Sequence, residues 1–238
     1  MNQSTLAGAP RIFLPGWGVG TGPLQKSLEK TSWRPMPLPG ATGGTIPRTI
    51  TAARDCLLQD LPEVCHLGGW SLGGILAMAC AIAAPKRILS LFLMATTPSF
   101  ISRKGWDIGR PPAELQAFMH TIKQEDEALF PRFIGSFCRG DSVPNAAEYV
   151  ISNASPMPQA ALEAGLAWLY EADLRRDAEK ISCPATILHG GNDPLVSPDA
   201  SRWLADRIPS SRLVILPGRA HALFAGDDAG FLQELLSS

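Results

Sequence analysis

Short apolar segments alternate along this chain with longer segments of helical periodicity, and this alternation restricts the possible folds more than any other feature. Parallel strands need a crossover between them, usually a helix, so the pattern predicts a parallel sheet covered by helices. Runs rich in leucine, isoleucine and valine are typical of strands buried on both faces. The expected strands are residues 11–14, 33–37, 64–67, 88–94, 185–189 and 212–216.

Three of the connecting helices have recognisable beginnings. Thr45, followed by Pro47, predicts one start, and Ser197-Pro198-Asp199 predicts another in which Ser197 is the cap. A third helix is expected to begin at the turn after Leu67 and to run through the alanine-rich residues 75–84.

The alternation stops between Thr97 and Lys180, where only helices are expected. Prolines and glycines separate them into residues 112–124, 125–137, 145–153 and 159–170. Because the strand pattern resumes directly afterwards, we interpret residues 97–180 as a helical lid. It would be inserted into a single α/β domain that is formed by residues 1–96 and 181–238. A separately folding helical domain is the alternative.

Composition narrows the classes of partner and the compartment. The net charge of −1 argues against nucleic-acid binding, and no apolar run is long enough to span a membrane. Residues 1–10 lack the basic and apolar regions of a signal peptide. The five cysteines are odd in number and show no C-x-x-C spacing, which favours reduced thiols in a cytoplasmic protein.

The pentapeptide Gly69-Trp70-Ser71-Leu72-Gly73 has the G-x-S-x-G pattern of a nucleophile elbow, a sharp strand-to-helix turn. An apolar strand is expected before it and a helix after it, as such a turn requires. The serine of an elbow has a strained backbone, so residues two positions away must lack side chains. We therefore expect Ser71 to be a nucleophile. A glycine-rich turn without chemistry is the alternative.

A serine nucleophile needs a base. His66 lies within an expected strand, and His120 belongs to the lid. His189 ends a strand and could line the site, but it is too near Asp193 in sequence to be the base that Asp193 orients. His221 lies in a small-residue loop after the last strand and before an expected final helix, so we choose it as the base.

The acid should follow the penultimate strand, where Asp193 lies in Gly190-Gly191-Asn192-Asp193-Pro194. The chain order Ser71, Asp193, His221 is the order of serine hydrolases that use an elbow. Asp193 would hold the imidazole of His221 in the required tautomer. A turn without a catalytic part is the alternative for Asp193 alone.

Acyl transfer also needs N–H donors for the developing oxyanion. We expect one from the backbone of Leu72, which follows the nucleophile. The other is expected from Trp17, in the loop after the first strand, although Trp17 could serve only as an apolar wall.

These segments resemble the α/β-hydrolase superfamily over most of the chain, from about residue 11 to residue 236. More narrowly, they resemble the BioH-type pimeloyl-acyl-carrier-protein methyl ester esterases of biotin synthesis. The narrower resemblance is carried by the elbow, by Thr97-Pro98-Ser99-Phe100, and by Pro131-Arg132-Phe133-Ile134-Gly135-Ser136-Phe137. It differs at Pro15, where most relatives have histidine.

The resemblance implies an α/β-hydrolase fold and the hydrolysis of a carboxylic ester, as in biotin synthesis. It implies that the substrate contacts Trp17, Ser71, Leu72, Phe133, Ile134, Gly135, Ser136, Phe137 and His221. Acyl carrier protein would present the ester, and Arg132 and Arg139 flank the matching lid segment as candidate contacts with that acidic partner. Lid charges that are merely solvated are the alternative.

Other functions remain open at this point. The same scaffold hosts small-ester carboxylesterases, carbon–carbon bond hydrolases, aminopeptidases and silent ligand receptors, and fold does not select among them. The intact Ser-Asp-His series argues against a silent receptor. No metal-binding or dinucleotide motif occurs in the sequence, so we expect neither a metal nor a cofactor.

Overall fold

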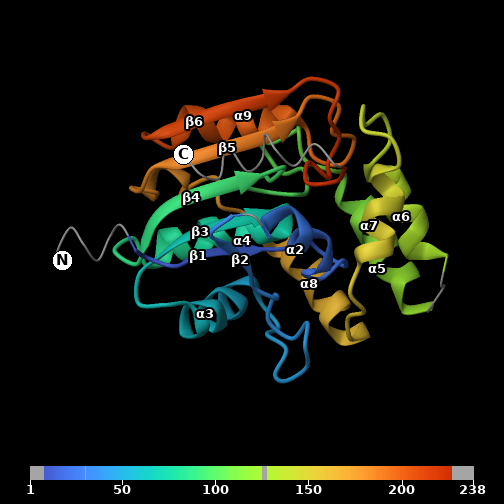
Figure 1. Cartoon of the computed structure of the whole chain (residues 1–238), viewed down its shortest axis with the longest axis horizontal. Helices are drawn as coiled ribbons and strands as arrows, with labels where there is room; N and C mark the ends of the chain where they lie inside the picture. Colours follow the sequence, from blue (N-terminus) through green and yellow to red (C-terminus); the bar gives the residue numbers. More distant parts are fainter. Residues whose placement is uncertain (1–7, 30, 125–127, 227–238) are drawn as a thin grey trace.

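The computed structural model describes residues 8–29, 31–124 and 128–226. In this part of the chain, six parallel strands form one sheet with the order β2-β1-β3-β4-β5-β6 (Figure 1). This arrangement confirms the predicted parallel α/β sheet. The strands are β1 (Arg11–Leu14), β2 (Trp33–Pro35), β3 (Cys65–Trp70), β4 (Ile88–Met94), β5 (Ala185–Gly190) and β6 (Ser211–Leu216).

Helices cover both faces of the sheet because the chain reverses direction once. The step from β1 to β2 runs opposite to all later steps, and right-handed crossovers therefore place its helix on the other face. That helix is α2 (Gly22–Leu28). The helices on the opposite face are α3 (Ile50–Asp60), α4 (Leu72–Ala83) and α9 (Pro198–Arg207).

Between β4 and β5 the described chain forms helices after a loop with two isolated β-bridges, and we call residues 97–180 the helical insertion. It contains α5 (Pro112–Thr121), η1 (Ile122–Gln124), α6 (Leu129–Phe137), α7 (Ala146–Asn153), α8 (Gln159–Glu171) and η2 (Ala178–Lys180). Figure 1 shows α5, α6 and α7 beyond the arrowheads of the strands, at the carboxyl edge of the sheet. Residues 125–127, and the final helix expected after His221, lie outside the described residues.

β5 and β6 are each one residue longer than expected, while β3 and β2 differ more, for reasons of backbone chemistry. β3 continues to Trp70 because its glycines make room for neighbours: a Cβ on Gly68 would lie 2.5 Å from the ring of Phe13. β2 ends at Pro35, two residues before Pro37, and proline cannot donate a ladder hydrogen bond.

The helix starts were predicted with mixed success. Ser197 caps α9 as expected, and its hydroxyl accepts a hydrogen bond from the amide of Asp199 at 3.2 Å. The start at Thr45 was wrong. Helix α3 begins at Ile50 and is capped by Thr49, while the carbonyl of Pro47 accepts the indole N–H of Trp168 at 3.1 Å. The segment before Thr49 is therefore a loop that packs against the insertion.

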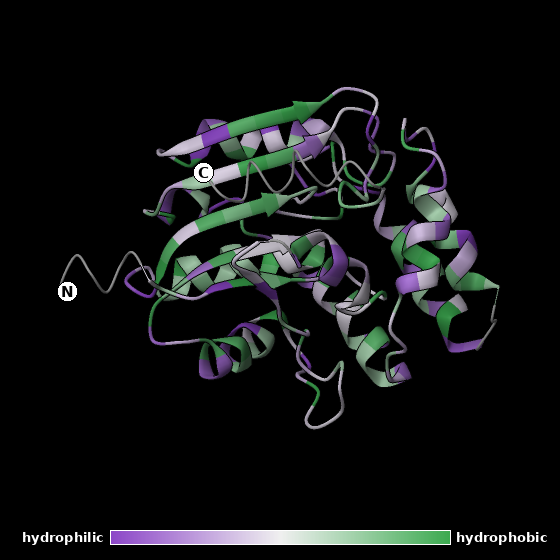
Figure 2. Ribbon diagram, in the orientation of Figure 1, coloured by the Kyte–Doolittle hydropathy of each residue, from purple (hydrophilic) through white to green (hydrophobic). Residues whose placement is uncertain are grey.

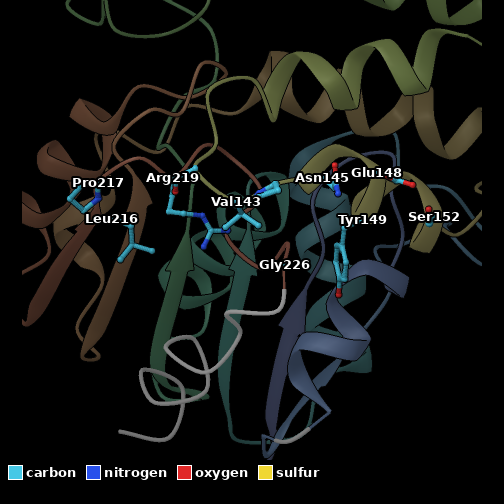
Figure 3. Close-up of a pocket in the computed structure, with 11 residues that line it drawn as sticks. Val143, Asn145, Glu148, Tyr149, Ser152, Leu216, Pro217, Arg219 and Gly226 are labelled. Atoms are coloured by element: carbon cyan, nitrogen blue, oxygen red, sulfur yellow. The ribbon is translucent and has the colours of Figure 1, made fainter.

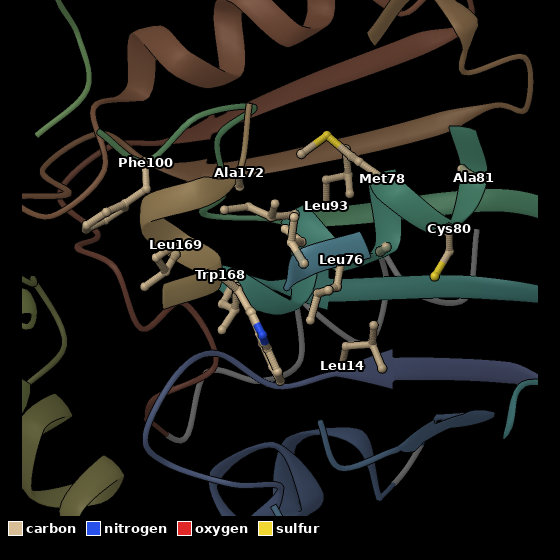
Figure 4. Packing of buried hydrophobic residues seen from close by; sticks show 14 of the residues in the cluster. Leu14, Leu76, Met78, Cys80, Ala81, Leu93, Phe100, Trp168, Leu169 and Ala172 are labelled. Atoms are coloured by element: carbon tan, nitrogen blue, oxygen red, sulfur yellow. The ribbon is translucent and has the colours of Figure 1, made fainter. Parts of the chain in front are cut away.

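The helical insertion shares a hydrophobic core with the sheet. Trp168 and Leu169 of α8, and Ala172 directly after it, belong to the same buried cluster as Leu76 and Leu93 (Figure 4). Figure 2 shows apolar residues along the strands and α4, whereas α5, α6 and α7 alternate between polar and apolar positions. Among the described helices, none has the length and apolar character that a membrane span requires.

All five cysteines are free thiols, and four of them are buried. Burial raises the pKa of Cys65 and Cys183 to about 11, and that of Cys80 and Cys138 to about 12. Only the thiolate reacts with disulfide reagents.

At pH 8 we therefore expect an aromatic disulfide reagent to modify the native protein at Cys56 alone, because the other four thiols stay protonated and covered. In denaturant, all five should react. Absorbance of the released thiolate gives both counts, and a Cys56→Ser variant is the control. Rapid reaction of more than one thiol in the native protein would contradict the burial described here.

Candidate active site

The backbone at Ser71 is strained in the way that a nucleophile elbow requires. Ser71 has φ 55° and ψ −119°, and it joins β3 directly to α4. A Cβ on Gly69 would lie 2.3 Å from the backbone of Gly73, and one on Gly73 would lie 2.4 Å from the carbonyl oxygen of Leu14. Thr96 donates its hydroxyl proton to the carbonyl of Ser71 at 2.7 Å. Close backbone contacts and the hydrogen bond from Thr96 thus hold the turn in this conformation.

Two loops bring an acid and an imidazole together. Asp193 follows β5, and His221 lies after β6; Nδ1 of His221 is 2.7 Å from Oδ2 of Asp193. Because a carboxylate only accepts, Nδ1 carries the proton in this contact. Nε2 of His221 is buried and has no hydrogen-bond partner among the described residues. His221 lines the same cavity as Ser71, so Nε2 is the ring atom available to accept a proton there.

The carboxylate of Asp193 is almost wholly buried and well supplied with donors. Its Oδ1 accepts the amide protons of Leu195 and Val196, both at 2.9 Å. Burial by itself would raise the pKa of Asp193, but the charge of His221 and hydrogen bonds from His189 and His221 outweigh it. They hold the pKa of this carboxyl well below its usual range. Asp193 is therefore a permanent anion behind the imidazole.

The cavity above Ser71 is narrow and almost entirely apolar. Its lining is Trp17, Trp70, Ser71, Phe100, Leu115, Phe118, Phe133, Phe137, Leu166, Leu169, Leu195 and His221. Both indole N–H groups are engaged elsewhere: Trp17 donates to Leu162 O at 2.8 Å, and Trp70 donates to His221 O at 3.0 Å. The polar groups of this lining that remain available are therefore the hydroxyl of Ser71 and the imidazole of His221.

The loop after β1 lies against the start of α4. A Cβ on Gly16 would lie 2.6 Å from the ring of Trp70, and the carbonyls of Leu14 and Pro15 lie against Gly73. This contact places the loop that carries Trp17 beside the start of α4, where Leu72 lies. Within the described chain, neither of these two amides donates a hydrogen bond to another residue. The side chain of Trp17 also forms a wall, stacked on Phe130 at 5.5 Å.

Helix α6 presents only part of the predicted contact segment to the cavity. Phe133 and Phe137 line it, one helical turn apart. Ile134 points into a neighbouring core cluster, while Gly135 and Ser136 are exposed. The helical period, which a contiguous sequence match ignores, explains why these three residues do not line the cavity. Leu72 is not among the residues that line the cavity, and its side chain lies in the core.

The other histidines lie away from the cavity. Nδ1 of His66 contacts the hydroxyl of Ser90 at 2.7 Å between β3 and β4, and His120 is exposed on α5. His189 is fully buried behind Asp193 and does not line the cavity, contrary to the possibility left open by its place in the sequence.

A larger cavity of about 780 Å³ lies elsewhere, between α7 and the loop after β6 (Figure 3). It is lined by Val143, Tyr149, Leu216, Arg219 and others, and by none of Ser71, Asp193 and His221. Size alone does not locate chemistry, so the smaller cavity at Ser71 is the candidate site.

Sequence reasoning missed a buried carboxylate that holds the His221 loop. Oδ1 of Asp141, in the helical insertion, accepts from the guanidinium Nε of Arg219 and from the amide of Val143, both at 2.9 Å. Its Oδ2 accepts the amide proton of Ala220 at 2.9 Å. The side chain of Asp141 is only 1% exposed. No local motif marks this aspartate, because its partner Arg219 is far away in sequence.

Comparison with known proteins identifies the family to which the chain belongs. A family model described as "Alpha/beta hydrolase family" matches residues 12–234. The chain belongs to this family.

Two similar relatives of this alpha/beta hydrolase are named pimeloyl-[acyl-carrier protein] methyl ester esterase. The one from Nitrosomonas europaea is 30% identical over 242 residues, covering 93% of this chain and 92% of the relative. The one from Aeromonas hydrophila is 32% identical over 240 residues, covering 95% and 93%. Among solved structures, an esterase from Exiguobacterium antarcticum is similar with a TM-score of 0.79 at 18% identity, over 97% of this chain and 93% of that one.

The buried pair of Asp141 and Arg219 should contribute strongly to stability. We expect Asp141→Asn to lower the free energy of unfolding by about 3 kcal/mol, because the buried guanidinium of Arg219 then loses the negative charge of this carboxylate. Urea unfolding followed by tryptophan fluorescence measures this loss.

Asp173→Asn is the matched control. Asp173 also binds an arginine, Arg175, at 2.7 Å, but its side chain is 30% exposed. We expect a loss below about 1 kcal/mol there, as for other solvent-exposed pairs. Equal losses in the two variants would show that burial does not set the strength of the Asp141 contact.

Proposed function

We propose that this hydrolase cleaves carboxylic esters through an acyl-enzyme formed on Ser71. The observation that carries the proposal is a strained serine in the same apolar cavity as His221, whose Nδ1 binds Asp193 behind it. Ser71 Oγ attacks the ester carbonyl while Nε2 of His221 takes its proton. The amides of Trp17 and Leu72 donate to the oxyanion of the tetrahedral intermediate.

The remaining steps return the site to its starting state. The imidazolium of His221, stabilised by Asp193, gives its proton to the departing alkoxide, which leaves as an alcohol. Water then attacks the acyl-enzyme, and His221 takes one of the water's protons. Collapse of the second tetrahedral intermediate breaks the bond to Ser71 Oγ, which regains a proton from His221. The carboxylic acid product then loses its proton to solvent and leaves as a carboxylate.

For the substrate we propose the methyl ester of pimeloyl-acyl carrier protein, as in biotin synthesis. The names of relatives at about 30% identity over most of the chain support this assignment. The lining of the cavity supports it too, because aromatic and leucine side chains suit a chain of methylenes that ends in a neutral ester. Methanol would be the alcohol released, and the acyl group would stay attached to its carrier.

We further propose that the helical insertion acts as a lid on a single domain formed by residues 1–96 and 181–238. In support, α5, α6 and α8 each contribute two side chains to the lining of the cavity. A cytoplasmic location is proposed as well, supported by the five free thiols.

Arg132 and Arg139 are proposed to contact the carrier protein. Both are exposed, near the two ends of the α6 segment whose Phe133 and Phe137 line the cavity. A guanidinium suits the acidic surface of a carrier protein or its phosphopantetheine phosphate. The arginines would thus act on encounter and binding, while the chemistry takes place beneath them.

The catalytic assignments predict large losses of activity. Ser71→Ala and His221→Ala should each lower kcat by about 10⁴ to 10⁶, since either one removes the nucleophile–base unit. Asp193→Asn should cost less, because Asp193 orients and stabilises the imidazole without attacking. The assay is hydrolysis of a short-chain chromogenic ester, with circular dichroism as the check on folding. A Ser71→Ala variant with a tenth of normal activity would refute the proposed function.

The carrier-protein contact makes a selective prediction. Replacing Arg132 and Arg139 together by alanine should lower kcat/KM for a carrier-protein methyl ester about tenfold, because rim charges govern encounter and binding. Hydrolysis of a small chromogenic ester should hardly change. Raising salt from about 50 to about 300 mM should reproduce the selective loss in the unaltered protein, since salt screens exposed charges.

A double variant of Arg202 and Arg212, exposed arginines on α9 and β6, is the matched control and should behave as the unaltered protein. Equal loss on both esters would mean that Arg132 and Arg139 hold the insertion together. No loss on either ester would favour a general carboxylesterase.

A further inference from the structure

His189 is a fully buried histidine for which the proposed reaction has no use so far. It lies near the end of β5, four residues before Asp193, and the side chains of both residues are 0% exposed. Its ring is absent from the lining of the Ser71 cavity, so it cannot touch a substrate there. Any role of His189 must therefore come from its contacts within the protein.

The three contacts of His189 determine where its proton lies. Nε2 lies 3.1 Å from Oδ2 of Asp193 and 3.0 Å from the carbonyl oxygen of Val196. A carboxylate and a carbonyl can only accept, so Nε2 must carry a hydrogen. Nδ1 lies 2.6 Å from the hydroxyl of Ser201 on α9. In the neutral ring that hydroxyl donates to Nδ1 and fixes the tautomer.

We propose that His189 is a positioning residue for Asp193. Oδ2 accepts the Nδ1–H of His221 and also faces the Nε2–H of His189, which is shared with the carbonyl of Val196, while the amides of Leu195 and Val196 donate to Oδ1. Four donors from three directions fix the rotation of the carboxylate. Oδ2 of Asp193 is then held facing Nδ1 of His221.

This arrangement also links the triad to the frame of the domain. His189 belongs to a central part of the fold, between β4 and β6, and Ser201 belongs to the helix packed on β5 and β6. The loop that carries Asp193 is therefore tied back to the sheet through a side chain. Groups that hold a functional residue in place typically change activity when lost, without touching substrate.

The inference rests on the proposed function, and amide substitutions can test it. In His189→Gln, the amide nitrogen takes the place of Nε2 and can donate to Asp193. In His189→Asn, the shorter side chain places its amide near Nδ1, toward Ser201. His189→Leu removes both contacts. Each variant would be assayed on a small chromogenic ester, beside Ser71→Ala.

We expect His189→Leu and His189→Asn to lower kcat about ten- to a hundredfold, in line with the loss of other orienting partners. KM should stay unchanged, because His189 does not line the cavity. His189→Gln should recover kcat to within about threefold, since its amide supplies the donor at the required position. The far-downfield proton resonance of the His221–Asp193 hydrogen bond should move in the leucine and asparagine variants and return in the glutamine variant.

Other outcomes would overturn the inference. Unchanged kcat in His189→Leu would show that Asp193 needs no such donor. Equal activity of the glutamine and asparagine variants would show that the position of the donor is irrelevant, and this comparison stands even if the leucine variant fails to fold. An unmoved resonance beside a lower kcat would indicate a role in folding only. Activity in Ser71→Ala would instead refute the proposed function, so the two failures are distinguishable.

Discussion

The approach of two backbone segments, at the start of α4 and after β1, governs the geometry of the candidate site. Gly73 lies so close to the carbonyls of Leu14 and Pro15 that a single added carbon would collide with them. The sheet makes this possible by pairing Leu14 with Gly69, so the carboxyl ends of β1 and β3 lie side by side. The chain reverses direction between these strands, and open parallel sheets bind their ligands at such points. Ser71 and the loop of Trp17 meet there because the backbones can touch.

Two buried carboxylates each hold a loop of the candidate site in place by accepting hydrogen bonds from its backbone amides. Asp193 and Asp141 each accept an amide proton from the residue two positions later, a local turn that side chains of this type favour. Each also accepts a bond from a distant basic side chain. One loop carries the acid, and the other anchors the loop of the base. Buried anions are costly unless their hydrogen-bonding capacity is filled, and here backbone amides supply much of it.

The sheet and the elbow at Ser71 could be predicted because their signals are local, and Asp193 and His221 could be chosen because each follows one of the last two strands. Strands buried on both faces are nearly continuous apolar runs, and an elbow needs glycines at fixed spacing. Features that depend on distant partners could not be predicted in this way. Helix α3 is capped by Thr49, and the carbonyl of Pro47 before it accepts the indole N–H of the distant Trp168. The cavity is lined by residues of α5 and α8 as well as by those of the predicted α6. The pairing of Asp141 with Arg219 likewise exists only once the chain is folded.

The apolar lining of the cavity affects the fate of the product as well as the choice of substrate. Under the proposed reaction, a neutral ester becomes a carboxylate within walls that offer it few polar partners beyond Ser71, His221 and the amide donors. Holding an anion in such surroundings is unfavourable by several kcal/mol unless it is paired, and Asp193 already supplies a negative charge behind His221. Under the proposed reaction, this change of charge would favour release of the product. Product release would then be fast, and the acid product would be a weak inhibitor because it binds the cavity less well than the ester does.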